Sequence, residues 1–273
     1  MLKDINLGQY YPGDSKIHKY DPRLKILSVM FFIVQLFFVK NLYLFIPQII
    51  FLTIVTLASG LKFKTVFKGL KPLRWIILIT FIINLLFVGG TVLFSFLFIT
   101  ITKESLILAT TTSTRILLLV WGSSILTLTT SPIELTDGIE SLLKPFKVIG
   151  LPAHEISMMM TIALRFIPTL IEETDKIMKA QKARGADFES GNVLNRAKNL
   201  VPLLVPLFIS SFRRADELAT AMESRCYNGG KGRTKLNKPV IKSSDIVLFI
   251  ISIIFCSAII AASVLMKWKR ILE

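Results

Sequence analysis

The sequence predicts an all-α membrane protein with about five transmembrane helices and a platform of three amphipathic helices outside the lipid. Two observations carry this prediction. Hydrophobic residues make up 52% of the 273 residues, and 20 of these are phenylalanine, which is more apolar than soluble domains usually are. Apolar runs near bilayer length, which takes about 20 helical residues, fill the first half and the end of the chain. A long polar segment separates them.

Five apolar runs are the candidate transmembrane helices. They are residues 24–39, 42–60, 73–101, 106–129 and 246–266. The third run is overlong and holds Gly89 and Gly90 in its middle, where a helix would kink, re-enter the membrane or split. The runs predict an N-terminal transmembrane region (1–130) of about four spans, a helical polar domain (131–244), and a C-terminal transmembrane helix with its tail (245–273).

Lysine and arginine place the polar domain in the cytoplasm, because loops rich in these residues resist translocation. The loop between the second and third runs carries five cations, whereas the turns after the first and third runs offer only Lys40 and Lys103. The five are Lys62, Lys64, Lys68, Lys71 and Arg74. We therefore expect a multi-pass protein of the cell membrane with residues 131–244 on the cytoplasmic side.

Charge and composition exclude several kinds of site. The net charge of +15 is spread over loops and helices, which suits anionic lipid headgroups or an acidic partner better than nucleic acid. The two cysteines, Cys226 and Cys256, form no CxxC motif, and the two histidines, His18 and His154, have no ligand partner at metal spacing. No metal site and no catalytic residue is predicted.

Residues 131–244 read as three helices. Ser131, Pro132 and Glu134 form a capping box with proline at the first helical position, which predicts a short helix to about residue 146. Apolar residues recur at helical spacing over 154–185, where Pro168 is expected to bend the helix. The third helix is expected over 194–225. Charged neighbours on the polar face of the second helix predict solvated ion pairs along it: Glu172, Glu173, Asp175, Lys176 and Lys179.

The second and third of these helices end in two similar tripeptides. They are Ala183-Arg184-Gly185 and Ser224-Arg225-Cys226. When the helices are aligned by their arginines, Asp175 matches Asp216 and Ala180 matches Ala221. A single arginine at a helix end is an ordinary C-terminal cation, which caps unpaired carbonyls. A matched pair favours guanidinium groups that dock in grooves of two similar partner subunits.

Arg115 is the one clear charge inside an apolar run, where it lies among threonines and a serine. An arginine at the centre of a bilayer costs at least about 2.5–3.5 kcal/mol, so it must face protein or water and find acceptors. This favours a structural tie between spans, through hydroxyl and carbonyl groups, over a role in translocation.

Three stretches resemble the transmembrane scaffold, or T component, of energy-coupling factor (ECF) transporters, and the resemblance spans nearly the whole chain. The stretches are the pair of arginine tripeptides, Ser15-Lys16-Ile17-His18-Lys19-Tyr20-Asp21-Pro22-Arg23-Leu24-Lys25, and Leu164-Arg165-Phe166-Ile167-Pro168. Cys226 departs from the pattern, because the family usually has glycine there. Its side chain is expected to alter how the chain leaves the helix.

The resemblance implies a coupling subunit rather than an enzyme. Such a subunit binds two cytoplasmic ABC-type ATPases, through Arg184 and Arg225, and a small membrane-embedded substrate-capture (S) component. ATP is then used by the partner subunits, this chain binds no cofactor, and the cargo is a vitamin or other micronutrient. The alternative is a stand-alone secondary carrier, which would need membrane carboxylates and broken helices in paired halves.

Overall fold

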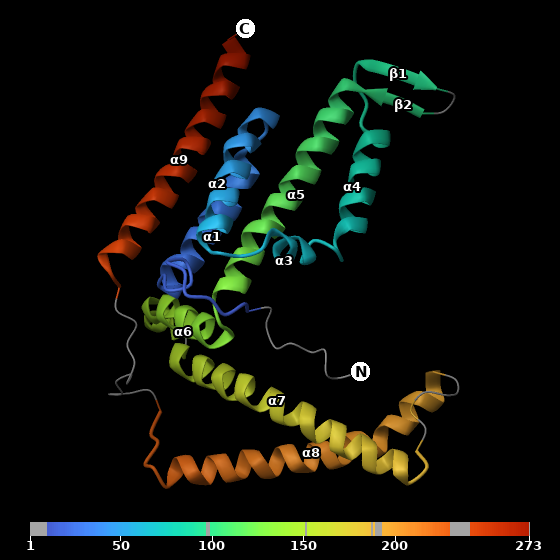
Figure 1. The fold of residues 1–273 in the computed structure, drawn as a ribbon, viewed down its shortest axis with the longest axis vertical. Coiled ribbons are helices and arrows are strands. Elements are labelled where there is room, and N and C mark those ends of the chain that lie inside the picture. The colour runs from blue at the N-terminus through green and yellow to red at the C-terminus, as the bar shows by residue number, and fades with distance from the viewer. Residues whose placement is uncertain are drawn as a thin grey trace. The chain divides into compact units, whose positions relative to one another are not determined.

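A computed structural model describes residues 10–96, 99–150, 152–186, 188, 193–229 and 241–272, and most of these residues are helical (Figure 1). The chain divides into two compact units. We call the one formed by Gly8–Gly138 and Pro239–Glu273 the transmembrane unit, and the one that contains Ile139–Lys238 the coupling unit. The domain boundaries expected from the sequence stay a prediction.

The transmembrane unit begins with α1 (Pro22–Phe38), a 3-10 turn η2 (Leu42–Leu44), α2 (Phe45–Ala58) and the short α3 (Phe63–Lys68). Asp21 starts α1 as its N-cap. Its Oδ1 accepts a hydrogen bond from the backbone N–H of Arg23 at 2.9 Å, and Pro22 fills the first helical position, where its missing N–H costs nothing. The sequence Asp21-Pro22-Arg23 is therefore a helix start.

The overlong third run splits at its glycine pair. Its first part forms α4 (Arg74–Phe87), but its second part forms an antiparallel hairpin of β1 (Val92–Phe96) and β2 (Ile99–Thr102). Valine, isoleucine and threonine crowd this stretch and favour extended backbone. The Glu104 carboxylate fixes the start of the hairpin by accepting a hydrogen bond from the backbone N–H of Thr91 at 2.7 Å. A Cβ at Gly90 would collide with that carboxylate.

Two long helices complete the transmembrane unit, α5 (Lys103–Thr129) and α9 (Ser243–Leu272). Within the described ranges, α5 and residues 243–266 of α9 are the two helices long and apolar enough to cross a membrane, while Leu42–Ala58 and Arg74–Phe87 are shorter apolar helices. The number of spans stays a prediction. Leu36, Leu118 and Trp121 lie in the shared core of α1, α2, α5 and α9.

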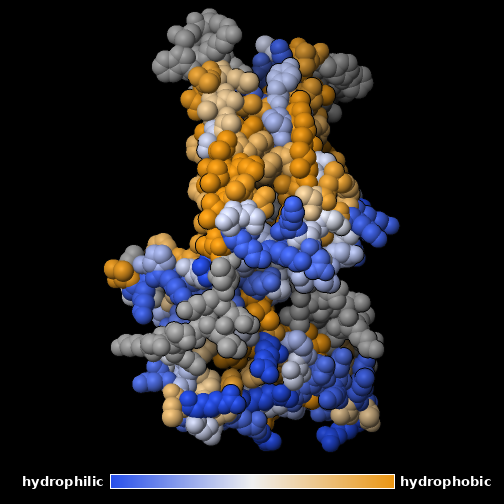
Figure 2. Space-filling model, turned by 60° about the vertical axis from the view of Figure 1, so that its left-hand side comes forward, coloured by the Kyte–Doolittle hydropathy of each residue, from blue (hydrophilic) through white to orange (hydrophobic). Residues whose placement is uncertain are grey.

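The outward faces of these helices are apolar. Isoleucine, phenylalanine and tryptophan side chains are more than half exposed on α2, α4 and α9, and they form the orange belt of Figure 2. Examples are Ile54, Trp75 and Ile254. A belt of this kind is the surface that a helix bundle presents to lipid tails.

The remaining helices are α6 (Pro132–Leu143), the 3-10 turn η3 (Lys144–Ile149), α7 (Ala153–Ala183) and α8 (Val193–Glu223). The capping box is confirmed, because Glu134 N–H donates to Ser131 Oγ at 3.3 Å and Ser131 N–H donates to Glu134 Oε2 at 3.0 Å. The ends of α7 and α8 lie within two residues of those predicted. α7 runs through Pro168 as one continuous helix.

Candidate functional site

The end of α7 is a glycine-closed turn that fixes the position of Arg184. Arg184 is the C-cap, and Gly185 adopts the left-handed conformation with φ +89°. Gly185 N–H donates to Lys182 O at 3.0 Å, and Ala186 N–H donates to Gln181 O at 2.9 Å. These two bonds define a Schellman motif, which satisfies the last carbonyls of a helix.

The end of α8 repeats the same motif residue for residue. Cys226 N–H donates to Glu223 O at 2.8 Å, and Tyr227 N–H donates to Met222 O at 3.0 Å. Arg225 therefore takes the C-cap position that Arg184 takes in α7. The likeness between the two tripeptides is thus a likeness of backbone geometry as well as of sequence.

Cys226 occupies the position of Gly185 in this match. Its φ is +56°, and it is the single non-glycine residue with positive φ among the described residues. The left-handed conformation costs an L-residue roughly 1–2 kcal/mol, because Cβ approaches the following carbonyl oxygen. The side chain nonetheless leaves the two hydrogen bonds of the turn intact. These bonds show no sign of the altered helix exit that we expected from cysteine.

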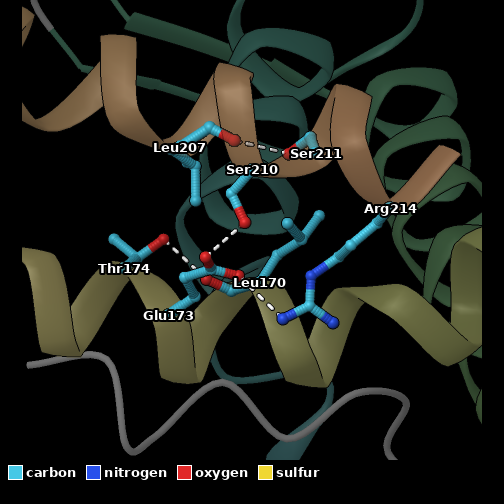
Figure 3. A network of polar contacts seen from close by, with 7 residues as sticks. All are labelled: Leu170, Glu173, Thr174, Leu207, Ser210, Ser211 and Arg214. Atoms are coloured by element: carbon cyan, nitrogen blue, oxygen red, sulfur yellow. Dashed lines mark hydrogen bonds and ion pairs between the residues drawn. The ribbon is translucent and has the colours of Figure 1, made fainter. Parts of the chain in front are cut away.

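A polar clamp holds α7 and α8 together (Figure 3). Glu173 of α7 accepts a hydrogen bond from Ser210 Oγ and a charge-assisted one from Arg214 Nη2, the latter at 3.1 Å, and both donors belong to α8. The expectation that Glu173 pairs with lysines of its own helix is therefore wrong. Its side chain faces the neighbouring helix instead, where a partly buried ion pair is screened less by solvent.

The clamp and one further contact show that α7 and α8 run antiparallel. Glu173 meets Ser210, and further along α7 the Gln181 amide donates to Pro202 O at 3.4 Å, so α7 residue numbers rise as those of α8 fall. The arginine ends consequently point away from each other. With a helical rise of 1.5 Å per residue, Arg184 and Arg225 lie on the order of 40 Å apart.

Both arginine ends are open to solvent. Ala183, Arg184 and Gly185 are exposed, and so are the three residues of the second tripeptide, Ser224, Arg225 and Cys226. In the part of the chain that the structure describes, neither guanidinium has an ion pair or hydrogen bond. Two long cations on rigid, capped helix ends are therefore available to acceptors on other molecules.

Arg115 lies in the transmembrane unit and caps the end of α1. Its Nε donates to Leu36 O at 3.0 Å and its Nη2 donates to Val39 O at 2.7 Å. These carbonyls belong to the last turn of α1, which carries the negative end of the helix dipole. Ser263 of α9 adds a bond to Phe38 O at 2.7 Å. The three bonds join α1, α5 and α9 at one point.

Sequence reasoning missed a second cation that joins helices. Lys25 of α1 is buried, and its Nζ donates to Thr129 O at 3.1 Å and to Thr130 Oγ1 at 2.9 Å. Lys25 thus holds the C-terminal end of α5, as Arg115 holds that of α1. A lysine within the first turn of an apolar helix was the available signal, because a buried amine needs acceptors.

Comparison with known proteins agrees with these observations. Residues 13–236 match the model of the CbiQ family, described as cobalt transport protein. The chain is 54% identical to the energy-coupling factor transporter transmembrane protein EcfT of Clostridium kluyveri, over 96% of this chain and 98% of that protein. It is 45% identical to the protein of the same name from Bacillus subtilis, over 95% and 98%.

These matches extend across both units and include both arginine ends. The transmembrane components that they name are parts of multi-subunit transporters and are not enzymes. The chain belongs to the CbiQ family, as a transmembrane component of the energy-coupling factor type.

Proposed function

We propose that this chain couples two cytoplasmic ABC-type ATPases to a small membrane-embedded capture protein for vitamins or other micronutrients. The ATPases bind and hydrolyse ATP, the capture protein selects the cargo, and this chain binds no cofactor of its own. The observation that carries the proposal is the pair of matched, exposed arginine ends at opposite ends of the α7–α8 pair. One such end would be an ordinary helix terminus.

The geometry suits two separate docking sites. Because α7 and α8 are antiparallel, each arginine end faces a different neighbour, and a separation on the order of 40 Å leaves room for one ATPase at each end. Guanidinium groups form charge-assisted hydrogen bonds that are each worth about 1.5–3 kcal/mol. The Glu173 clamp makes the pair one stiff element, so movement of either ATPase moves both ends.

An apolar face on α8 suits contact with the capture protein. Phe208, Ile209 and Phe212 are each more than half exposed, and Met159 on α7 is exposed to the same degree. Methionine and aromatic side chains adapt to changing apolar contacts. In the proposed cycle the ATPases close on ATP, the coupling helices shift, and the capture protein is tilted or released. The coupling unit is on the cytoplasmic side of the cell membrane in this proposal.

The test reverses the charge at both helix ends. We expect the double variant Arg184→Glu, Arg225→Glu to lose its ATPases when the complex is purified through the capture protein. The matched control is Lys179→Glu, Arg213→Glu, which changes one exposed cation on each of the same helices and the same total charge. The control should keep its ATPases.

An intact, active complex from the helix-end variant would refute the docking role. Loss of the ATPases from both variants would show a general charge effect instead. Reconstitution separates the coupling role from the carrier alternative. The purified chain alone in vesicles should transport none of the vitamins that the full complex takes up, and uptake by the chain alone would favour a carrier.

A further inference from the structure

The transmembrane unit contains an apolar cavity that the coupling role leaves unexplained. Its volume is about 160 Å³, and its walls come from α1, α2, α5 and α9 together with residues just before α1. Phe51, Ile125 and Cys256 form part of its inner wall. Figure 1 shows these four helices side by side.

Polar groups gather at one end of this cavity. Ser28 Oγ lies 3.3 Å from the Tyr20 hydroxyl and 3.1 Å from Ser252 Oγ, so three hydroxyls from three segments form a chain. Burial raises the pKa of the Tyr20 phenol above its ordinary value, which keeps this group neutral. Lys25 also lines this end, but its amine is held by Thr129 and Thr130.

The cavity reaches the lipid-facing surface beside α9. Leu248 and Ile251 line it, and both are also exposed on the outside of the unit, by 38% and 52%. The same two residues thus border the cavity and the apolar belt. Along α9 the cavity therefore borders the surface that faces the bilayer.

We propose that this cavity holds the methyl end of an acyl chain of a membrane phospholipid, while the hydroxyls of Tyr20, Ser28 and Ser252 hydrogen-bond to one another in its wall. An empty void with apolar walls is unfavourable, because its lining lacks contacts on one side. Water gains nothing there, since apolar cavities stay dry. A lipid tail enters at no hydrophobic cost, because it leaves one apolar surrounding for another.

The size of the cavity fits the end of a chain rather than a whole lipid. An apolar protein cavity of about 150 Å³ accommodates benzene, so this one accepts roughly six chain carbons. The rest of the lipid remains in the bilayer beside Leu248 and Ile251. The lipid then acts as a wedge between α9 and the neighbouring helices α1, α2 and α5.

The test uses a phosphatidylcholine with a diazirine at the methyl end of one chain, mixed into phosphatidylcholine vesicles that contain the purified chain. After illumination, peptide mass spectrometry maps the adducts. We expect adducts on the inner wall, at Phe51, Ile125 and Cys256. Adducts at Val247, which is 54% exposed, report contact with the bulk bilayer and serve as the internal standard.

Two variants fill the cavity, and a third variant is the matched control. Ser252→Phe and Leu126→Phe each place a ring in the cavity and should lower the inner-wall adducts at least five-fold relative to Val247. Ile254→Phe adds the same ring on the exposed side of α9 and should leave them unchanged. The thermal transition of each variant shows whether it is folded, and two filling variants guard against failure of one.

Adducts confined to outward-facing residues in the folded chain would overturn the proposal. So would inner-wall adducts that persist in a folded filling variant, because the chain end would then not occupy this volume. Neither result depends on ATPase binding.

Discussion

Arg115 in the transmembrane unit and the arginines of the coupling unit differ in where their acceptors lie. Arg115 donates to two carbonyls at the end of α1, so its acceptors are part of the same chain. Arg184 and Arg225 cap their own helices through the backbone, but their guanidinium groups find no acceptor among the described residues. An arginine of the first kind stabilises the fold, whereas a rigid, exposed one of the second kind is suited to a partner.

The largest effect is expected from removing either exposed arginine. Arg184→Ala and Arg225→Ala should each weaken binding of the ATPases by roughly 10- to 150-fold, because each removes charge-assisted bonds worth about 1.5–3 kcal/mol. Titration of the purified ATPases onto the chain in nanodiscs measures this loss. The thermal transition of the chain alone should not change, and a marked drop in it would assign these arginines to the fold.

At Arg115 we expect the opposite result, a loss of stability of the chain itself. Arg115→Met leaves Leu36 O and Val39 O without donors, and we expect a loss of about 2 kcal/mol in the free energy of unfolding. Two charge-assisted bonds of about 1.5–3 kcal/mol each exceed the relief of about 2.5–3.5 kcal/mol from removing a charge in the bilayer. Equilibrium unfolding in mixed micelles measures it. Arg74→Met, at an exposed arginine over Trp75, should change stability by less than about 0.5 kcal/mol.

A smaller effect is expected at the clamp between the coupling helices. Glu173→Gln keeps the shape of the side chain but removes the charge that Arg214 pairs with, which should cost about 1 kcal/mol because the pair is only partly buried. Hydrogen exchange of the α7 and α8 amides would register this as faster opening. Glu172→Gln, on the exposed side of the same turn, is the control and should leave exchange unchanged.

The smallest effect compares the two helix ends directly. Cys226→Gly should stabilise the coupling unit by about 0.5–1 kcal/mol, because glycine adopts positive φ without strain. Gly185→Cys should destabilise it by a similar amount. Thermal unfolding of the two variants and of the double exchange measures both. A destabilising Cys226→Gly would mean that the thiol makes a favourable contact that outweighs its backbone strain.

The sequence alone predicted the features that depend on residues close together in the chain. Helical periodicity and caps located α7 and α8 to within two residues, and Ser131 and Glu134 identified the start of α6. The hairpin after α4 was not predicted, because an apolar run of bilayer length favours a transmembrane helix. The hairpin depends on the break at Gly89-Gly90 and on the contact of Glu104 with Thr91, which only the structure shows. The split itself was among the outcomes expected.

Long-range partners were the part that sequence reasoning could not supply. Arg115 was expected to find hydroxyl and carbonyl acceptors, but which ones depends on the packing of α5 against the end of α1, far away in the chain. Glu173 has Lys176 one turn away and still pairs with Arg214 of α8. The tripeptides were found because the two ends resemble each other in sequence. Their opposite directions became visible only with two contacts between the helices, Glu173–Ser210 and Gln181–Pro202.

The antiparallel course of α7 and α8 gives the pair an approximate dyad that passes near Glu173. A dimer of identical subunits, placed around that axis, would meet the same cap geometry twice, once at each arginine end. Within the two tripeptides, Ala183 against Ser224 and Gly185 against Cys226 break this equivalence. At the tripeptides, one half of such a dimer would therefore meet a hydroxyl and a thiol that the other half does not meet.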